Sequence, residues 1–413
     1  MNVKTLTEQI LRKMSSIGSW QFKFMSNLFS LLLAMRGRYN FCNMARWSSV
    51  VESTFRDNYA KTFAWLEFNR LLVDQYLSND LAIAFDPSFV PKSGKHTPGL
   101  GYFYSGCAGR ELRGLELSGI AVIDQKDKTA LHLEAIQTVG LQEGEKLLSF
   151  YARTLTSRRQ QLQQISTLLL VDAYFAKRPF IDTMAEAGFI IVTRLRKDAR
   201  LRYIYTGPKR KGKGRPKQYD GRIDLHNLRA NKVRPCAQAN DGSWIAYELV
   251  ANVQAWKRNV KLVIIHELLE DGSIKTARLI ACTDMDKDGG EVLFAYHSRF
   301  QIEILYRDAK QHLGLTHCQA RSEQKIHFHL NASLTAVSIA KAAHYLEDGK
   351  QDQAFSLADI KTRYANELLL ERFISTFGIN PNMSKIKSLR DAVTNFGRMA
   401  AWIATDYCGK RLT

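Results

Sequence analysis

The chain has 413 residues, of which 45% are hydrophobic and 24% are charged. This composition excludes a disordered chain, a collagen and a small disulfide scaffold, and the length suggests about two to four domains. Lys and Arg number 59 against 40 Asp and Glu, which gives a net charge of +19. Such a surplus favours an anionic polymer as the partner, and nucleic acid is the first candidate.

The sequence gives no sign of a membrane span or a secretory signal. Its longest apolar run near the N-terminus, residues 28–35, is far shorter than the roughly 20 residues that a span needs. The first residues include Glu8 and contain no apolar signal-peptide core. The six cysteines form no CxxC pair, which fits a reducing cytosol and argues against a zinc finger. We therefore expect a cytoplasmic protein with no membrane partner.

Residues 1–75 have the pattern of helices. Apolar residues recur every three or four positions, Gly and Pro are nearly absent, and basic residues are interleaved. Two interpretations stand equal at this point. The segment is either an amphipathic bundle with a solvated basic face or a helical N-terminal domain that binds DNA ends.

Residues 76–197 alternate between strands and helices. The apolar run LAIAF ends at Asp86, and the run STLLLVDAYF contains Asp172. The predicted strands begin at Leu81 and cover 101–109, 115–124, 166–175 and 189–195, and the predicted helices cover 143–164 and 177–187. This order predicts a mixed α/β sheet whose later connections are crossover helices.

Residues 198–290 interrupt this alternation as a β-rich insertion, with strand-like runs at 244–250 and 260–268. A helix is expected from Glu291 to about Leu313, with Gly314 as its C-cap, in a second part of the core that covers 291–345. The remainder, 346–413, is predicted to be a helical C-terminal region.

Asp86 and Asp172 each follow an apolar strand. If the two strands are parallel neighbours, both carboxylates emerge at one edge of the sheet, where ligands of such sheets bind. Two close carboxylates repel unless a cation lies between them, and Mg²⁺ prefers such oxygen ligands. The alternative is that each Asp simply begins a turn, and the paired pattern leaves the two interpretations nearly even.

A third acid lies in the helix that follows the insertion. Tyr296, Arg299, Glu303 and Lys310 are spaced by 3, 4 and 7 residues. At about 100° per residue they fall within an arc of about 60° on one helix face. An ordinary solvated salt-bridge face would explain Arg299 and Glu303. The tyrosine and the lysine make sense if the stripe holds a phosphate backbone.

The pattern Tyr296-x2-Arg299-x3-Glu303-x6-Lys310 resembles the signature of DDE transposases of the insertion-sequence-four type, the family of the Tn-five and Tn-ten transposases. The resemblance implies a ribonuclease-H-like (retroviral-integrase-like) core with a β-rich insertion, flanked by helical N- and C-terminal domains. It also implies two Mg²⁺ ions held by Asp86, Asp172 and Glu303, with Mn²⁺ as a substitute. Tyr296, Arg299 and Lys310 would then contact DNA near the cut.

By this resemblance the protein is a transposase that cleaves and transfers strands at the ends of an insertion sequence, by cut-and-paste. Its partners would be the terminal inverted repeats and the target DNA, bound by a homodimer near the bacterial nucleoid. Trp244 and Trp256 are candidates to hold a flipped base, although core packing is favoured for each. The alternatives are a nuclease of the same fold without strand transfer, and a non-catalytic DNA-binding derivative.

A basic loop at 207–218 offers a second DNA contact. It contains Lys209, Arg210, Lys211, Lys213 and Arg215, around a Gly-Arg-Pro core that resembles an AT-hook. The alternative is a flexible solvated loop. We favour the DNA contact, because the neighbouring core is expected to hold DNA.

Overall fold

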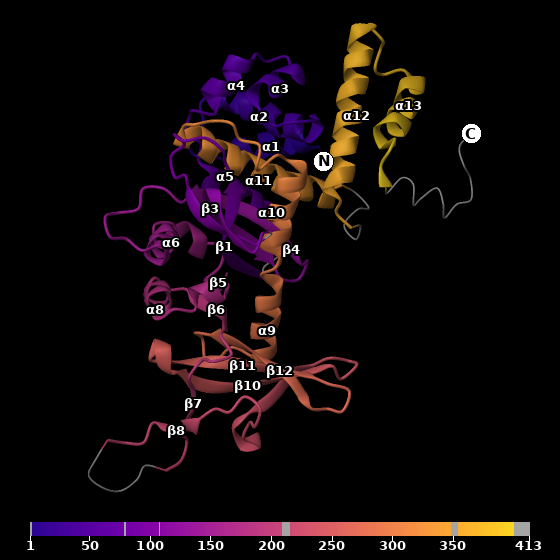
Figure 1. The fold of residues 1–413 in the computed structure, drawn as a ribbon. Helices are drawn as coiled ribbons and strands as arrows, with labels where there is room; N and C mark the ends of the chain where they lie inside the picture. Colours follow the sequence, from indigo (N-terminus) through magenta and orange to yellow (C-terminus); the bar gives the residue numbers. More distant parts are fainter. Residues whose placement is uncertain (1, 78–79, 107, 209–214, 348–353, 400–413) are drawn as a thin grey trace.

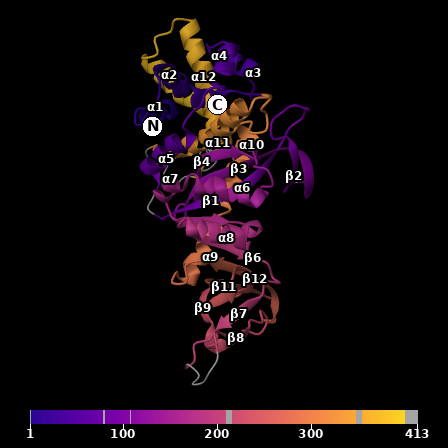
Figure 2. The ribbon, with the colours of Figure 1, turned by 90° about the vertical axis from the view of Figure 1, so that its left-hand side faces the viewer.

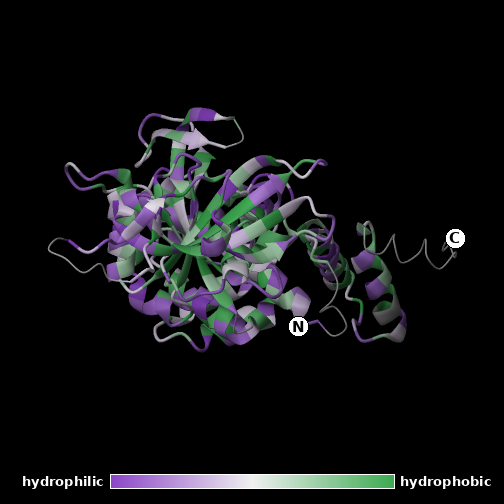
Figure 3. Cartoon of the chain, turned by 90° about the horizontal axis from the view of Figure 1, so that it is seen from below, coloured by the Kyte–Doolittle hydropathy of each residue, from purple (hydrophilic) through white to green (hydrophobic). Residues whose placement is uncertain are grey.

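The computed structural model describes the chain except for residues 1, 78–79, 107, 209–214, 348–353 and 400–413. The molecule is elongated, with helices at one end, part of the sheet in the middle and the β-rich segment at the other end (Figures 1 and 2). Apolar residues gather toward the centre of the sheet, and polar residues cover the outside (Figure 3). None of the helices in the described ranges combines the length and the apolar character that a membrane crossing needs.

The N-terminal region is helical, as predicted. Its helices are α1 (Val3–Leu11), α2 (Ser19–Ala34), α3 (Phe41–Arg46), α4 (Glu52–Asn58) and α5 (Trp65–Tyr76). They share one hydrophobic core with a face of the sheet and with α11 (Glu323–Tyr345).

Two further helices follow, α12 (Leu357–Thr376) and α13 (Ser384–Asn395). The start of α12 contributes Leu357 and Ile360 to this core, and the rest of α12 extends beyond it with α13 (Figure 1). Lys361 of α12 donates to the carbonyls of Leu32, Leu33 and Met35 at the end of α2. A buried ammonium group thus satisfies carbonyls that a helix C-terminus leaves free, and it ties α12 to the N-terminal helices.

The sheet begins with β1 (Leu81–Pro91), β2 (Gly101–Ser105), β3 (Arg110–Asp124) and β4 (Thr129–Gln137). β3 pairs antiparallel with each of the other three. The sequence did not predict β4, whose run is broken by polar side chains. His132 bonds to the Asn331 side chain of α11, and such partners make polar residues compatible with a buried strand.

The next segment contains the two parallel crossovers. Its elements are α6 (Leu147–Thr156), α7 (Arg159–Gln163), β5 (Leu168–Val171), η1 (Ala173–Phe175), α8 (Arg178–Glu186) and β6 (Ile190–Leu195). β5 pairs parallel with β1 and with β6, which confirms the predicted crossover connections. The single helix predicted at 143–164 is wrong in detail, because the chain forms two helices that are interrupted around Ser157 and Arg158.

The β-rich segment continues the same sheet. It contains β7 (Leu201–Ile204), β8 (Tyr219–Arg222), η2 (Ala230–Lys232), β9 (Arg234–Gln238), β10 (Trp244–Val253), η3 (Gln254–Trp256), β11 (Arg258–Leu268) and β12 (Ile274–Cys282). β12 pairs antiparallel with β6, and the main path is β2-β3-β1-β5-β6-β12-β11-β10-β7-β8. One mostly antiparallel, twelve-stranded sheet therefore runs from the middle of the molecule to its far end.

The helix predicted from Glu291 to Leu313 is two helices, α9 (Gly289–Ser298) and α10 (Gln301–His312). At the break the N–H of Phe300 donates to the carbonyl of His297, which is a tighter turn than an α-helix makes. Ser298 Oγ donates to the carbonyl of Ala295, a local bond of the kind that bends helices. The C-cap of α10 is Leu313, one residue before the predicted Gly314. Gly314 follows it with a φ of 61°, the left-handed conformation that commonly ends a helix.

Candidate active site

Asp86 and Asp172 lie on neighbouring parallel strands. The β1–β5 register pairs Ala84 with Leu170, so two further residues along each strand place Asp86 beside Asp172. β1 does not end at Asp86, as the sequence suggested, because β3 continues beside it as far as Pro91. β5 does end one residue before Asp172, which leaves this side of Asp86 without a strand neighbour. The two acids therefore share one edge of the parallel part of the sheet.

Arg299 connects this edge to Glu303. Its guanidinium nitrogen Nη2 lies 2.7 Å from Glu303 Oε1, and Nη1 lies 3.7 Å from Asp86 Oδ1. The Arg299 side chain is 14% exposed, against 40% for Glu303. The arginine is thus a largely buried cation between two carboxylates, which does not fit the alternative of a solvated salt-bridge face.

The three acids influence one another electrostatically. Burial raises the pKa of Asp86 from 3.8 to about 7, the charges of Arg299 and Lys310 oppose that rise, and Asp172 and Glu303 add to it. Burial also raises the pKa of Asp172, while a hydrogen bond from the Tyr174 N–H lowers it. Carboxylates in this condition favour a cation as neighbour.

The remaining signature residues lie around the same edge. Lys310 Nζ donates to Ser88 Oγ at 2.9 Å, two residues beyond Asp86 on β1. The half-buried ring of Tyr296 lies 6.0 Å from the guanidinium carbon of Arg299. The four residues of the predicted stripe therefore remain near one another, although the helix that carries them is interrupted.

Two residues of β6 beside this edge were not predicted from the sequence. Thr193 Oγ1 donates to the carbonyl of Asp172 at 2.8 Å and so helps to hold that turn. The register pairs Val171 with Thr193, which puts the exposed Arg194 beside Asp172. Burial raises the pKa of Tyr296, and the charges of Arg299 and Arg194 oppose that rise, so Arg194 also lies near Tyr296. The only signal in the sequence is that Arg194 lies near the end of a strand, which becomes informative once the strand order is known.

The chemistry of these donors fits a hard divalent cation, because carboxylate oxygens are the ligands that Mg²⁺ and Mn²⁺ take. As the side chains lie, however, no three Asp, Glu, His or Cys residues in the described ranges form a group that could hold a metal ion. The guanidinium of Arg299 occupies the position between Asp86 and Glu303. Its Nη1 atom is buried and makes no hydrogen bond.

Two histidines near the N-terminal end of α11 bond to the backbone. His329 Nε2 donates to the carbonyl of Gly314 at 2.8 Å, and His317 Nδ1 accepts the N–H of Tyr39 at 3.4 Å. Both histidines therefore help to fix the chain around the end of α10.

The basic loop is the stretch of sequence between β7 and β8, and β8 lies at the far end of the molecule (Figure 1). Lys209, Arg210, Lys211 and Lys213 fall outside the described residues. Arg215 is exposed, and its Nη2 donates to Gln218 Oε1 at 3.4 Å.

The two candidate tryptophans differ in their environments. Trp256 is 2% exposed, and its Nε1 donates to the carbonyl of Ala176 at 3.0 Å, so it packs in the core. Trp244 is half-buried at the start of β10.

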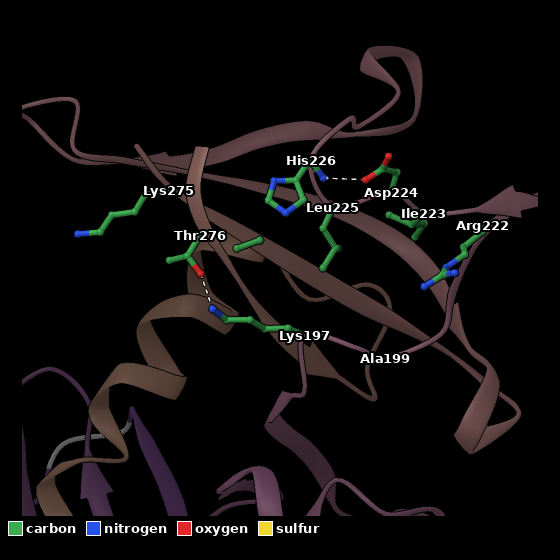
Figure 4. Close-up of a pocket in the computed structure, with 10 residues that line it drawn as sticks. Lys197, Ala199, Arg222, Ile223, Asp224, Leu225, His226, Lys275 and Thr276 are labelled. Atoms are coloured by element: carbon green, nitrogen blue, oxygen red, sulfur yellow. Dashed lines mark hydrogen bonds between the residues drawn. The ribbon is translucent and has the colours of Figure 1, made fainter. Parts of the chain in front are cut away.

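A separate basic pocket of about 610 Å³ lies on the β-rich segment (Figure 4). Lys197, Arg222, His226 and Lys275 line it, with Asp224 as its acidic member. None of the three candidate acids belongs to this pocket, so it is distinct from the acidic edge.

Residues 151–339 match the family model described as a transposase DDE domain. The match begins in α6 and ends in α11, so it includes Asp172, Glu303 and the rest of the signature, while Asp86 precedes it. Over this stretch, which is less than half of the chain, the sequence is similar to transposase DDE domains, and this confirms the resemblance to DDE transposases. Domains of this class are nucleotidyl transferases that act on DNA and generally depend on a divalent metal. No curated protein matches the chain.

Proposed function

We propose that the chain is a DNA transposase of the insertion-sequence-four type, which cleaves the ends of its own element and joins them to a target by cut-and-paste. The observation that carries the proposal is the juxtaposition of Asp86 and Asp172 on adjacent parallel strands, with Glu303 linked to Asp86 through Arg299. The strand order β4-β3-β1-β5-β6, antiparallel and then parallel, supports a ribonuclease-H-like core.

Asp86, Asp172 and Glu303 are the residues that would hold Mg²⁺ or Mn²⁺. Two such ions would supply the activation of an oxygen nucleophile and the stabilisation of the leaving oxygen in phosphodiester exchange. The protein's own contribution is a fixed pair of aspartates on the sheet and a glutamate on a helix packed against it. Arg299 is the counterion of these acids when no other cation lies between them.

Arg299, Lys310, Tyr296 and Arg194 would hold the DNA strand at this edge. Arg299 and Arg194 offer planar forks that match a phosphate, and Lys310 offers a point charge. Tyr296 can donate its hydroxyl to a phosphate oxygen. All four lie beside the strand edge that carries the aspartates.

The partners in this proposal are the terminal inverted repeats and the target DNA. Each end must be cut and the two ends must be joined together, so we propose a homodimer in the DNA complex. A nuclease of the same fold would use the same acids without the joining step, and a non-catalytic derivative would have no reason to keep all three.

The test is a strand-transfer assay. One duplex carries the inverted repeat bordering the gene together with its flanking DNA and reports cleavage, and a second duplex ends in the repeat with a free 3′-hydroxyl and reports joining. Each is incubated with the full chain, a supercoiled plasmid and Mg²⁺ or Mn²⁺. We expect a joined product on a gel. Cleavage without joining would identify the nuclease, and binding without cleavage the non-catalytic derivative.

Substitution of each acid provides the matching prediction. Asp86→Asn, Asp172→Asn and Glu303→Gln should each lower cleavage by at least about 100-fold, since replacing even an outer partner of a metal ligand costs up to that much. End binding in a mobility-shift assay should stay nearly unchanged. Glu291→Gln is the control, because Glu291 lies on α9 with a 64% exposed side chain. If Asp86→Asn cleaves as well as the parent, Asp86 is not a metal ligand.

A further inference from the structure

The side chain of Tyr306 reaches from α10 to the backbone of the first acid. Its hydroxyl donates to the carbonyl of Asp86 at 2.6 Å, across 220 residues of sequence. Tyr306 is 5% exposed, so the bond is shielded from water. It lies three residues after Glu303, and residues three apart on a helix face the same side. One helix face therefore carries both the third acid and a hydrogen bond to the first.

Gly119 leaves the space that the ring of Tyr306 fills. Gly119 is the antiparallel partner of Asp86 in the β1–β3 ladder. A Cβ atom at position 119 would lie 1.8 Å from the Tyr306 hydroxyl oxygen and 2.8 Å from Cζ, distances at which atoms overlap. Gly119 is not among the glycines with positive φ, so its backbone does not require glycine. The requirement at position 119 is room for Tyr306.

A second contact joins α10 to β1 further along both elements. Lys310, one turn further along the helix, donates to Ser88 Oγ at 2.9 Å, and Ser88 lies two residues beyond Asp86 on β1. With both bonds in place, α10 can neither rotate nor slide along the strand without losing one of them. A shift of α10 by one residue would move Glu303 by about 1.5 Å relative to β1. A shift of that size is enough to prevent Asp86 and Glu303 from binding the same cation.

We propose that Tyr306, seated in the space left by Gly119, is a positioning residue that sets the separation of Asp86 and Glu303. The proposal rests on the function proposed above, in which these two acids share a divalent cation. Tyr306 itself is proposed to touch neither DNA nor metal. It acts through the backbone of Asp86.

The test measures the binding of Mn²⁺ to the full chain without DNA, by isothermal titration or electron paramagnetic resonance. Tyr306→Phe keeps the ring and removes the hydroxyl, so we expect Mn²⁺ affinity to fall by about tenfold. Tyr203→Phe is the matched control, because Tyr203 is 1% exposed and its hydroxyl accepts the backbone N–H of Arg229 in the β-rich segment. Both variants should lose a similar amount of thermal stability, and only Tyr306→Phe should lose Mn²⁺ affinity.

A double-mutant cycle tests the seat itself. Gly119→Ala alone should lower the melting temperature strongly, because Tyr306 is pushed out. In the Tyr306→Phe background the same change should cost less, since the atom with the closest approach is gone. Equal costs in both backgrounds would contradict the seating of Tyr306 at Gly119.

The two proposals fail in different ways. If the parent chain binds Mn²⁺ and Asp86→Asn abolishes that binding, while Tyr306→Phe binds as tightly as the parent, the positioning role is wrong and the metal site stands. If the parent binds no Mn²⁺, or Asp86→Asn binds it equally well, the metal site and the positioning role are both wrong.

Discussion

Arg299 has a different role in the folded protein from the one that its local sequence suggests. In the sequence it forms an i,i+4 pair with Glu303, which on an exposed helix contributes only a few tenths of a kcal/mol. In the fold it is 14% exposed and also faces Asp86 from 3.7 Å. Asp86 retains a pKa of about 7 despite this neighbour, because burial outweighs the attraction. The arginine is therefore part of an acidic site and more than a surface ion pair.

His329 yields a prediction about pH at the scale of one residue. Burial lowers the pKa of His329 from 6.5 to about 4, although the hydrogen bond from its ring to the carbonyl of Gly314 opposes that shift. Below pH 6.5 His329 becomes protonated in the unfolded chain but stays neutral in the folded chain until the pH approaches 4. The free energy of unfolding therefore falls as the pH falls. His329→Gln keeps a hydrogen-bond donor for Gly314 and removes the titrating group. Between pH 7 and pH 5 the free energy of unfolding of this variant should fall by about 2 kcal/mol less than that of the parent, as measured by urea unfolding.

The control for this pH effect is His226→Gln, because His226 is exposed in the β-rich segment. That variant should lose stability with acid as the parent does. An identical acid sensitivity in the parent and in His329→Gln would show that His329 is not held neutral by its burial.

At the scale of elements, the β-rich segment is anchored to the helix that leads to the site. Glu248 of β10 is 4% exposed, and its Oε2 accepts the N–H of Gly289 at the start of α9 at 2.6 Å. The same carboxylate pairs with Arg234 and lies 3.3 Å from Lys261. A Cβ at Gly289 would lie 2.6 Å from the Glu248 side chain, so glycine permits this close approach. The strands of the insertion thereby fix where α9 begins.

Glu248→Ala should therefore lower the free energy of unfolding by about 3–5 kcal/mol, because it leaves the largely buried Lys261 and the N–H of Gly289 without their partner. Glu267→Ala is the matched control on the adjacent strand, where the Glu267–Arg278 pair is 28% and 43% exposed. That change should cost less than about 1 kcal/mol. Urea unfolding measures both, and similar losses would contradict the anchoring role of Glu248.

At the scale of the whole molecule, the positive charge is concentrated in one segment. Residues 194–234 contain fifteen Lys and Arg against three Asp, so these 41 residues carry twelve of the nineteen surplus charges. The segment begins beside Asp172 and reaches the far end of the elongated fold (Figure 1). This charge is carried by the stretch of chain that connects the strand beside Asp172 with the far end of the fold.

The binding of DNA should consequently weaken steeply with salt. Each phosphate contact contributes about 0.9 to the slope of log affinity against log salt, so Lys211→Gln/Lys213→Gln should reduce that slope by about 1 to 2. Lys126→Gln/Lys128→Gln removes the same charge from the β3–β4 turn, next to the start of β1 and away from the acids. Mobility-shift titrations at several salt concentrations should leave this control slope unchanged. Equal slopes for both double variants would rule out the loop as a DNA contact.

The sequence by itself determined the local features of this protein. Apolar runs predicted β1, β5 and β6, helical periodicity predicted the N-terminal helices, and residue spacing identified Tyr296, Arg299, Glu303 and Lys310. These features depend on neighbours within a few residues, which is the range over which side-chain periodicity carries information. The acids and the signature were therefore named from the sequence, and their catalytic roles remain predictions.

Only the tertiary structure decided how these parts meet. The joining of the β-rich segment to the core sheet, the strand β4, the break at Arg299 and the burial of that arginine all depend on partners far away in sequence. The seat of Tyr306 at Gly119 joins positions 187 residues apart. The sequence around Gly119 looks like the sequence around any glycine in a strand. It therefore does not indicate that this glycine makes room for a tyrosine from a distant helix.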